Sequence, residues 1–236
     1  MPRHPSSGNG NGTWETDMRR IIVATFISVD GVMQAPGGPQ EDLTGGFELG
    51  GWIAPYFDEA LGASLGDIFG HPFDLLLGRK TYEIFAAHWP YASDPKDPIA
   101  PVFNRVTKYV ASRTRPKLTW QNSRLLDADL AASLKALKGE DGPDLLVQGS
   151  SDLLQTLWKH ALVDELSLLT FPVVLGKGKR LFGSGAAPAA LKLIRSRSFP
   201  SGVIVANYKP EGEVRTGDFQ LAEPSEAELQ RRRNLI

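Results

Sequence analysis

The sequence predicts a three-layer α/β fold, in which a mostly parallel central sheet lies between helices and ends in antiparallel C-terminal strands. The first observation is an alternation of short apolar runs with amphipathic segments over residues 108–171. This pattern is typical of strand–helix–strand units and a parallel sheet. The second is a pair of alternating runs, Leu191–Ser198 and Val203–Tyr208, joined by the turn residues Pro200-Ser201-Gly202 into an antiparallel hairpin. No internal repeat or linker interrupts Arg19–Pro210, which indicates one domain.

The first half of the domain begins with a run of β-branched and aromatic residues, Ile21–Ile27, which predicts a buried strand. A long loop then extends from Asp30 to about Gly51, and loops of this length are often functional. A helix is predicted over Pro55–Phe69, because four apolar side chains share one helical face: Phe57, Leu61, Leu65 and Ile68.

The remaining elements follow in chain order. They are a strand at Phe73–Leu77, a helix at Tyr82–His88, a loop at Pro90–Pro101, a strand at Lys108–Ala111, a helix at Asp127–Lys138, a strand at Asp144–Gln148, a helix at Ser151–Leu162 and a strand at Asp164–Phe171. Polar, Gly-rich residues 1–18 are expected to form a disordered lead-in, and residues 211–236 a polar tail or a short docking helix. The folded domain is therefore expected to span residues 19–210.

The composition excludes several classes of protein. The chain has 236 residues with 26 Lys and Arg against 27 Asp and Glu, so no overall charge favours nucleic acid or an anionic membrane. No cysteine is present, which excludes disulfides, thiolate metal sites and cysteine nucleophiles. The four histidines lack metal-ligand spacing, so no metal is expected. Without a membrane-spanning run or a secretion signal, we expect a cytoplasmic protein.

Three junctions that follow predicted strands have the chemistry to bind phosphate. Ligands of open α/β sheets bind at the carboxyl ends of the strands. Gly78-Arg79-Lys80-Thr81 combines a flexible turn, two cations, a hydroxyl and the N–H groups of a helix start. Gln148-Gly149-Ser150-Ser151 offers a glycine and two serines at the next such position. Taken singly, the first segment is better explained by an ordinary capped helix with solvated charges, and the second is a weak signal because Ser is also a favoured N-cap.

The third junction, Ser112-Arg113-Thr114-Arg115, bears on the choice of nucleotide. Enzymes that prefer NAD place an acid near the adenosine ribose, whereas hydroxyl and Arg side chains suit a 2′-phosphate. If a dinucleotide binds here, we expect NADP; an exposed basic turn is the alternative interpretation. No Walker loop or G-x-G-x-x-G fingerprint occurs in the chain.

The order of these motifs resembles the dihydrofolate reductase-like superfamily. The resemblance covers about Arg19–Pro210 and is closest to the reductase domain, the C-terminal half, of the bifunctional riboflavin-biosynthesis deaminase-reductase and its stand-alone bacterial relatives. It rests on these motifs in sequence: Ile22–Gly31 with Ser28-Val29-Asp30-Gly31, Gly78-Arg79-Lys80-Thr81-Tyr82-Glu83, Gly149-Ser150, and Val163-Asp164-Glu165-Leu166 through Pro172-Val173-Val174-Leu175-Gly176-Lys177-Gly178. The zinc deaminase half is excluded, because the chain has neither its cysteines nor room for it.

The resemblance implies an NADPH-dependent reductase with an eight-stranded, dihydrofolate reductase-like sheet. By position, the cofactor phosphates would meet Gly78, Arg79, Lys80 and Thr81. The 2′-phosphate would lie beside Ser112 and Arg113. The pyrophosphate would run along Gln148, Gly149, Ser150 and Ser151, with Leu153 or Leu154 nearby. The nicotinamide carboxamide would lie near Ala24 and Thr25. The family also implies a homodimer, for which exposed edge strands near Val203–Tyr208 would be a plausible interface.

Substrate-binding and catalytic candidates are fewer. Asp30 is the first-ranked acid for a proton relay or a substrate contact, although Asp-Gly is equally a plain turn pair. Trp52 and Tyr82, with Phe47 and Trp89, would line an aromatic pocket for a flat heterocycle or else belong to the core. Asp58 or Glu59 lies roughly where dihydrofolate reductases hold the pterin, but an exposed helical carboxylate is the favoured interpretation, so dihydrofolate is not the favoured substrate.

The sequence therefore favours hydride transfer from NADPH to a small pyrimidine- or pteridine-like heterocycle. The loop Asp30–Gly51 would act as a lid that excludes water. Two alternatives stay open: a non-catalytic NADP- or ligand-binding protein of the same fold, and a true dihydrofolate reductase. Nucleic-acid binding has only Arg113, Arg115 and the run Arg231-Arg232-Arg233 in its favour.

Overall fold

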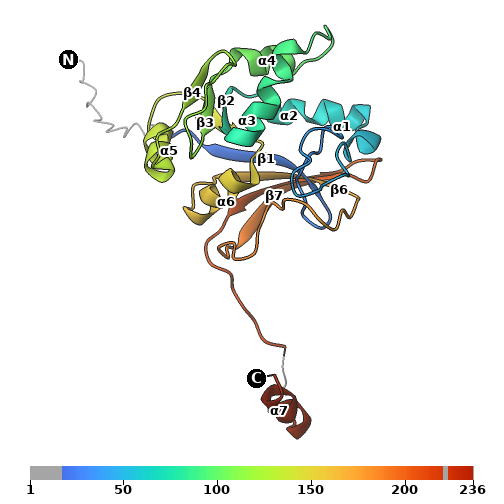
Figure 1. The fold of residues 1–236 in the computed structure, drawn as a ribbon. Coiled ribbons are helices and arrows are strands. Elements are labelled where there is room, and N and C mark those ends of the chain that lie inside the picture. The colour runs from blue at the N-terminus through green and yellow to red at the C-terminus, as the bar shows by residue number, and fades with distance from the viewer. Residues whose placement is uncertain (1–17, 220–222, 236) are drawn as a thin grey trace, which may run out of the picture.

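A computed structural model describes residues 18–219 and 223–235, and a sheet of eight strands lies at the centre of this part of the chain (Figure 1). The predicted lead-in therefore lies outside the described residues, apart from Met18. In chain order the strands are β1 (Ile21–Ser28), β2 (Phe73–Gly78), β3 (Lys108–Ala111), β4 (Ser123–Leu125), β5 (Asp144–Val147), β6 (Glu165–Phe171), β7 (Leu191–Ser198) and β8 (Ile204–Pro210).

The strand order β4-β3-β2-β5-β1-β6-β8-β7 confirms the predicted fold class. The first six strands of this order run parallel, and β1 lies between β5 and β6. Val23 is paired with Val147 on one side and with Leu166 on the other, so β1 is buried from both edges. The antiparallel pairs β6–β8 and β8–β7 complete the sheet at its C-terminal end.

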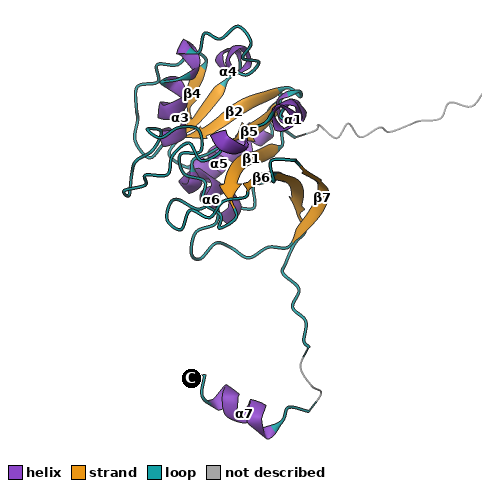
Figure 2. Cartoon of the chain, turned by 90° about the vertical axis from the view of Figure 1, so that its right-hand side faces the viewer, coloured by secondary structure: helices purple, strands orange, loops and turns teal. Residues whose placement is uncertain are grey.

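Helices cover both faces of the sheet, which gives the three layers that the sequence predicts (Figure 2). On one face, Leu134 and Leu157 pack with Val23 into a common core. On the other face the apolar side chains form two further clusters, one around Leu61 and one around Phe103. The α-helices are α1 (Glu59–Ser64), α2 (Gly66–Phe69), α3 (Arg79–Ala86), α4 (Ala100–Arg105), α5 (Leu130–Lys138), α6 (Ser151–Lys159) and α7 (Glu226–Arg233), and the short 3₁₀ turns are η1 (Ala54–Tyr56) and η2 (Trp89–Tyr91).

The single helix predicted over Pro55–Phe69 is wrong, because the structure divides this segment into η1, α1 and α2. Asp58 interrupts it: its backbone is extended and its carboxylate accepts a hydrogen bond from the N–H of Leu61, which starts a new helix. Phe57 therefore lies before that helix and is 42 % exposed, whereas Leu61 and Leu65 are buried as predicted. Two short elements were also missed, α4 and β4, the first of them starting at the end of the predicted Pro90–Pro101 loop.

An exposed edge strand does lie near Val203–Tyr208, but it is the neighbouring β7 and not this segment itself. This segment forms β8, which is hydrogen-bonded to β6 on one side and to β7 on the other. The edge strands are β4 and β7. The free edge of β7 carries Lys192, Arg195 and Arg197, and positive charges on an edge oppose pairing of the strand with a second copy of itself.

The C-terminal tail carries the short helix α7, whose side chains are not buried against the domain (Figure 1). Ser225 caps its start, and Glu228 pairs with Arg231 and Arg232 within the helix. Across residues 18–219 and 223–235, no helix has the length and apolar character that crossing a membrane requires.

Candidate functional site

Two of the three predicted junctions meet at the carboxyl ends of neighbouring strands. Gly78 ends β2 and Gly149 follows β5, and these strands pair in parallel. The N–H of Gly78 donates to the carbonyl oxygen of Gly149 at 3.1 Å. A Cβ atom on Gly78 would lie 2.2 Å from Ser150 Oγ, and one on Gly149 would lie 2.7 Å from Thr81 Oγ1. Both positions therefore require glycine for this approach, and the peptide bond between Gly149 and Ser150 is cis.

This meeting point combines the N-termini of two helices. α3 begins directly after Gly78 and α6 directly after Ser150, and neither helix has a side-chain cap at its start. Uncapped N–H groups and the positive ends of two helix dipoles form a site suited to anions. Thr81 and Ser150 add hydroxyl groups, although the exposed Asp152 places one acid in the first turn of α6.

The third junction lies beside the first two. Ala111 of β3 is opposite Gly78 in register, so Ser112 and Arg113 leave the sheet next to the Gly78 turn. Ser112 Oγ accepts a hydrogen bond from the N–H of Thr114 at 3.1 Å, and Arg113 is exposed. Because β3, β2 and β5 are neighbours in the sheet, all three junctions lie side by side at the carboxyl ends of these strands.

Other predicted cofactor residues lie deeper in the protein. Ala24 and Thr25 are each 3 % exposed within β1, where they are paired with Ser167 and Leu168 of β6. Leu153, on α6, packs into the core.

Arg79 is at the surface. It forms an exposed ion pair with Glu83 at 2.8 Å, one turn further along α3.

The structure gives Asp30 partners that the sequence did not reveal. Its carboxylate accepts hydrogen bonds from Ser28 Oγ at 2.6 Å and from the N–H groups of Leu175 and Gly176 at 3.0 and 2.9 Å. Arg180 lies 3.3 Å from the same carboxylate. The hydrogen bond from Ser28, followed by the one from Leu175, lowers the pKa of Asp30 to about 2.

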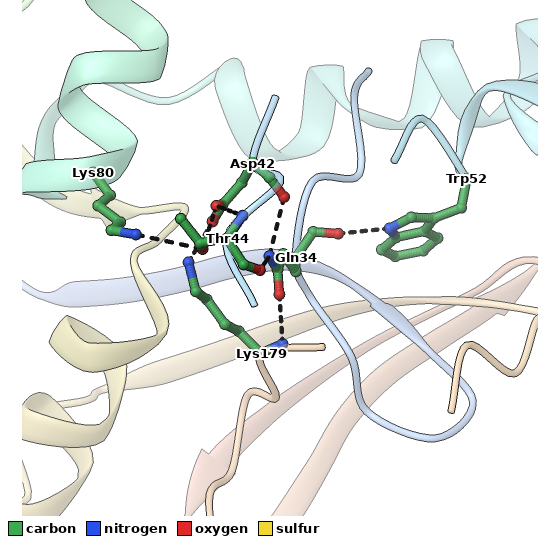
Figure 3. A network of polar contacts seen from close by, with 6 residues as sticks. All are labelled: Gln34, Asp42, Thr44, Trp52, Lys80 and Lys179. Carbon is green, nitrogen blue, oxygen red and sulfur yellow. Dashed lines mark hydrogen bonds and ion pairs between the residues drawn. The ribbon is translucent and has the colours of Figure 1, made fainter. Parts of the chain in front are cut away.

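The long loop is fastened by a polar network that sequence reasoning missed (Figure 3). Gln34 is 4 % exposed, and its amide nitrogen donates to the carbonyl oxygens of Asp42 and Thr44 at 3.0 and 2.8 Å. Its amide oxygen accepts from the N–H of Lys179 at 2.9 Å, and the Lys179 ammonium pairs with the Asp42 carboxylate. Lys80 of α3 donates to Thr44 Oγ1 at 3.4 Å, so this network reaches the first junction.

A cavity of about 280 Å³ lies beside this network. It is lined by Gln34, Thr44, Gly45, Phe47, Lys177, Gly178 and Lys179. The run of glycines and cations at residues 176–180 was visible in the sequence, but nothing local indicated that it would face the long loop. Two lysines line this cavity, and although the Lys179 ammonium is paired with Asp42, the positive charge of Lys177 favours an anionic ligand.

The pKa values of two acids in the long loop are shifted in opposite directions. Burial raises the pKa of Glu41, although its carboxylate accepts hydrogen bonds from the N–H groups of Gly37 and Gly38. Burial alone would also raise the pKa of Asp42, but hydrogen bonds from Lys179 and Thr44 outweigh it and leave that pKa lowered. Within the described part of the chain, no cluster of His, Asp and Glu has the arrangement of a metal site.

The aromatic candidates are mostly structural. Tyr82 is buried, and its hydroxyl accepts a hydrogen bond from the backbone N–H of Trp120 at 3.0 Å. Trp52 is buried too; its indole N–H donates to the carbonyl oxygen of Gln34 at 2.8 Å. Phe47 lines the cavity. Asp58 caps α1, whereas Glu59 is exposed.

Comparisons with known sequences show what the chain is similar to. The family model of the RibD C-terminal domain matches residues 19–205. Among curated proteins, the chain is 28 % identical to the uncharacterized protein YyaP of Bacillus subtilis, over 82 % of this chain and 96 % of that one. YwjB of the same organism is 22 % identical over 78 % of this chain and 95 % of its own length.

Solved structures show the same fold at low sequence identity. A protein from Shewanella sp. PV-4 assigned to riboflavin biosynthesis has a TM-score of 0.60 at 19 % identity, covering 82 % of this chain and 99 % of that chain. A pyrimidine reductase-like protein from Corynebacterium diphtheriae has a TM-score of 0.54 at 14 % identity, with 84 % and 93 % covered. The deaminase/5-amino-6-(5-phosphoribosylamino)uracil reductase of Thermotoga maritima has a TM-score of 0.53 at 13 % identity, and the match covers 82 % of this chain and 57 % of that longer one.

Proposed function

The chain belongs to the RibD C-terminal domain family, and we propose that it is an NADPH-dependent reductase of a small, pyrimidine-like heterocycle. The family and its reductase-like neighbours support an oxidoreductase of this kind. Bound NADPH would supply the hydride, while the protein would bind and orient the two reactants and exclude water.

The observation that carries this proposal is the approach of Gly78 and Gly149 to Ser150 and Thr81. A side chain at either glycine would collide with Ser150 or Thr81 and displace the two uncapped helix starts. Such a cradle of N–H and hydroxyl groups has the right chemistry for a pyrophosphate. Lys80, at the edge of the cradle, would add a positive charge.

The preference for NADPH over NADH rests on the third junction. Ser112 and the exposed Arg113 follow the strand next to the cradle. A hydroxyl and a guanidinium are the groups that suit a 2′-phosphate. The proposal therefore assigns the adenosine end of the cofactor to β3 and its pyrophosphate to β2 and β5.

The cavity beside the long loop would accept the substrate. Lys177 and Lys179 line it, and Phe47 contributes an aromatic wall. These groups suit a flat ring that bears an anionic substituent, such as the phosphoribosyl group in the substrate named for the Thermotoga maritima neighbour. The loop that contributes Thr44 and Phe47 would close over the bound ligand as a lid.

A turnover assay tests this function. The purified protein is incubated with NADPH in three separate reactions. They contain 5-amino-6-(5-phosphoribosylamino)uracil, its dephosphorylated form or dihydrofolate. Loss of NADPH absorbance and a reduced product by mass spectrometry are measured together. Reduction of the phosphorylated pyrimidine is the expected result, whereas reduction of dihydrofolate alone would identify a dihydrofolate reductase.

One observation favours a second candidate, a ligand-binding protein without turnover. Asp30, the first-ranked acid, is ionised and fully engaged in hydrogen bonds, so it is unsuited to give a proton. Tight NADPH binding with no reduction of any compound in the panel would support this alternative and contradict the reductase.

A further inference from the structure

The carboxylate of Asp30 joins two loops that are distant in sequence. It lies just after β1, yet it binds the N–H groups of Leu175 and Gly176 after β6. Arg180 reaches back to it with one guanidinium nitrogen at 3.3 Å and donates to the Asp30 carbonyl oxygen with the other. The Asp30 side chain is 19 % exposed and that of Arg180 is 42 % exposed, so the contact lies at the protein surface.

The segment that Asp30 holds supplies one wall of the cavity. Lys177, Gly178 and Lys179 lie between the residues bound by Asp30 at either end. The same wall is fixed from the other side, because the N–H of Met33 donates to the carbonyl oxygen of Lys179 at 2.8 Å. A Cβ on Gly178 would lie 2.6 Å from Val32 Cγ1, so the two loops are in close contact there.

We infer that Asp30 is a positioning residue, which sets the place of Lys177 and Lys179 in the cavity wall by holding the backbone of residues 175–180, while the Lys179 ammonium is held in turn by Asp42. This inference rests on the proposed function, since it assigns these lysines to substrate binding. Asp30 acts through the loop and contributes no proton to the reaction.

The ionisation of Asp30 supports this role. The hydrogen bonds from Ser28 Oγ and from the N–H groups of Leu175 and Gly176 lower the pKa of this carboxylate to about 2, so it is charged at neutral pH. A proton donor must hold its proton near the working pH. A charged acceptor, in contrast, makes stronger hydrogen bonds than a neutral one, which suits a residue that holds a loop in place.

The first test is structural and does not need turnover. Asp30→Asn is compared with wild type and with Asp141→Asn, an exposed acid between α5 and β5. Acetic anhydride labels lysines in each protein, and Lys117, which is exposed, serves as the internal standard. Losing the charged carboxylate should raise the labelling rate of Lys179 relative to Lys117 by about tenfold and speed amide exchange across residues 173–181. Unchanged labelling and exchange would overturn the inference.

The second test separates positioning from proton donation. With the substrate that the turnover assay identifies, Asp30→Asn should raise KM by about tenfold, because charge-assisted hydrogen bonds are lost. The shape of the pH profile should stay unchanged. The effect should largely disappear in a Lys177→Ala/Lys179→Ala background, because the lysines are the groups that Asp30 places. Loss of kcat at unchanged KM, with the basic limb of the pH profile removed, would instead make Asp30 a proton donor, because an acid that must carry its proton loses activity as the pH rises through its pKa.

The two proposals fail in different ways. If wild type does not bind NADPH, the proposed function fails, while the labelling and exchange results still decide whether Asp30 holds the loop. If wild type turns over and Asp30→Asn behaves like Asp141→Asn in every measurement, only the inference on Asp30 fails.

Discussion

Gly78 and Ser150 are in contact where two parallel strands end, and the space for a Cβ on the glycine is already taken by the serine hydroxyl and backbone. A Cβ there would lie 2.2 Å from Ser150 Oγ and 2.9 Å from Ser150 N. The φ of Gly78 is −69°, which any residue adopts, so the requirement for glycine comes from packing alone. The contact therefore defines the shape of the candidate phosphate cradle.

Substituting either glycine of the cradle should weaken both folding and NADPH binding. Gly78→Ala must displace the backbone of Ser150, and Gly149→Ala adds a side chain at φ +152° against Thr81. Overpacking and backbone strain of this kind cost about 1–3 kcal/mol of unfolding free energy. We expect thermal denaturation to show that loss and NADPH titration to show at least about a tenfold rise in Kd, since a ligand held by N–H groups is sensitive to small shifts.

Gly66→Ala is the matched control for these variants. Gly66 starts α2 and has open space where its Cβ would be. Its substitution should leave NADPH affinity unchanged and stability unchanged or raised by up to about 1 kcal/mol. Equal effects at all three glycines would show that the cradle has no special role.

The network around Gln34 predicts a stability and mobility change confined to the long loop. Gln34→Leu leaves the carbonyl oxygens of Asp42 and Thr44 and the N–H of Lys179 without their partner. Each buried group left unpaired costs about 1–3 kcal/mol, so the loop should open locally. Hydrogen exchange of residues 36–51 should accelerate, while Gln40→Leu, an exposed position in the same loop, should leave it unchanged.

Lys108 predicts an unusual dependence of stability on pH. Its side chain is fully buried, donates to the carbonyl oxygens of Asn104 and Val106, and lies 4.2 Å from the centroid of the Trp120 ring. Burial lowers the pKa of Lys108 from 10.5 to about 8. Below pH 8 the lysine is charged in both the folded and the unfolded state, and the cost of burying that charge destabilises the folded state. Between pH 8 and 10.5 the unfolded state binds more protons, so stability rises with pH, by at most about 3 kcal/mol.

Comparison with Lys108→Met isolates this effect from other groups that titrate at high pH. Denaturant unfolding at pH 7.5 and at pH 10 should show wild type gaining stability relative to the variant, with Lys117→Met behaving as wild type. A Lys108→Met difference that is the same at both pH values would contradict the lowered pKa.

The fold and the three junctions were predictable because they depend on local patterns. Apolar runs and glycine turns mark strand ends, and β3 and the two strands of the hairpin lie close to their predicted bounds. The strand order could not be derived from periodicity, and only that order brings Gly78 beside Gly149. The helix Pro55–Phe69 was mispredicted because its periodicity continued through a break that Asp58 makes.

The rest of the site depends on contacts between segments far apart in the chain. Gln34 lies in an aperiodic loop, and its partner Lys179 follows β6. Asp30 carried the local signal of an Asp-Gly turn, which is compatible with either a turn or a functional acid. Its four partners include Leu175, Gly176 and Arg180, and no local pattern reports a loop that folds back from so far along the chain.

The most direct test of the central claim is a titration of the protein with NADPH and NADH, followed by quenching of tryptophan fluorescence. We expect micromolar binding of NADPH, weaker binding of NADH, and a rise of about tenfold or more in the NADPH Kd alone on Arg113→Ala, because only NADPH has the 2′-phosphate. Arg215→Ala, an exposed arginine of the tail, should change neither affinity. Equal affinity for both nucleotides in wild type and Arg113→Ala, or no binding of either, would contradict the account.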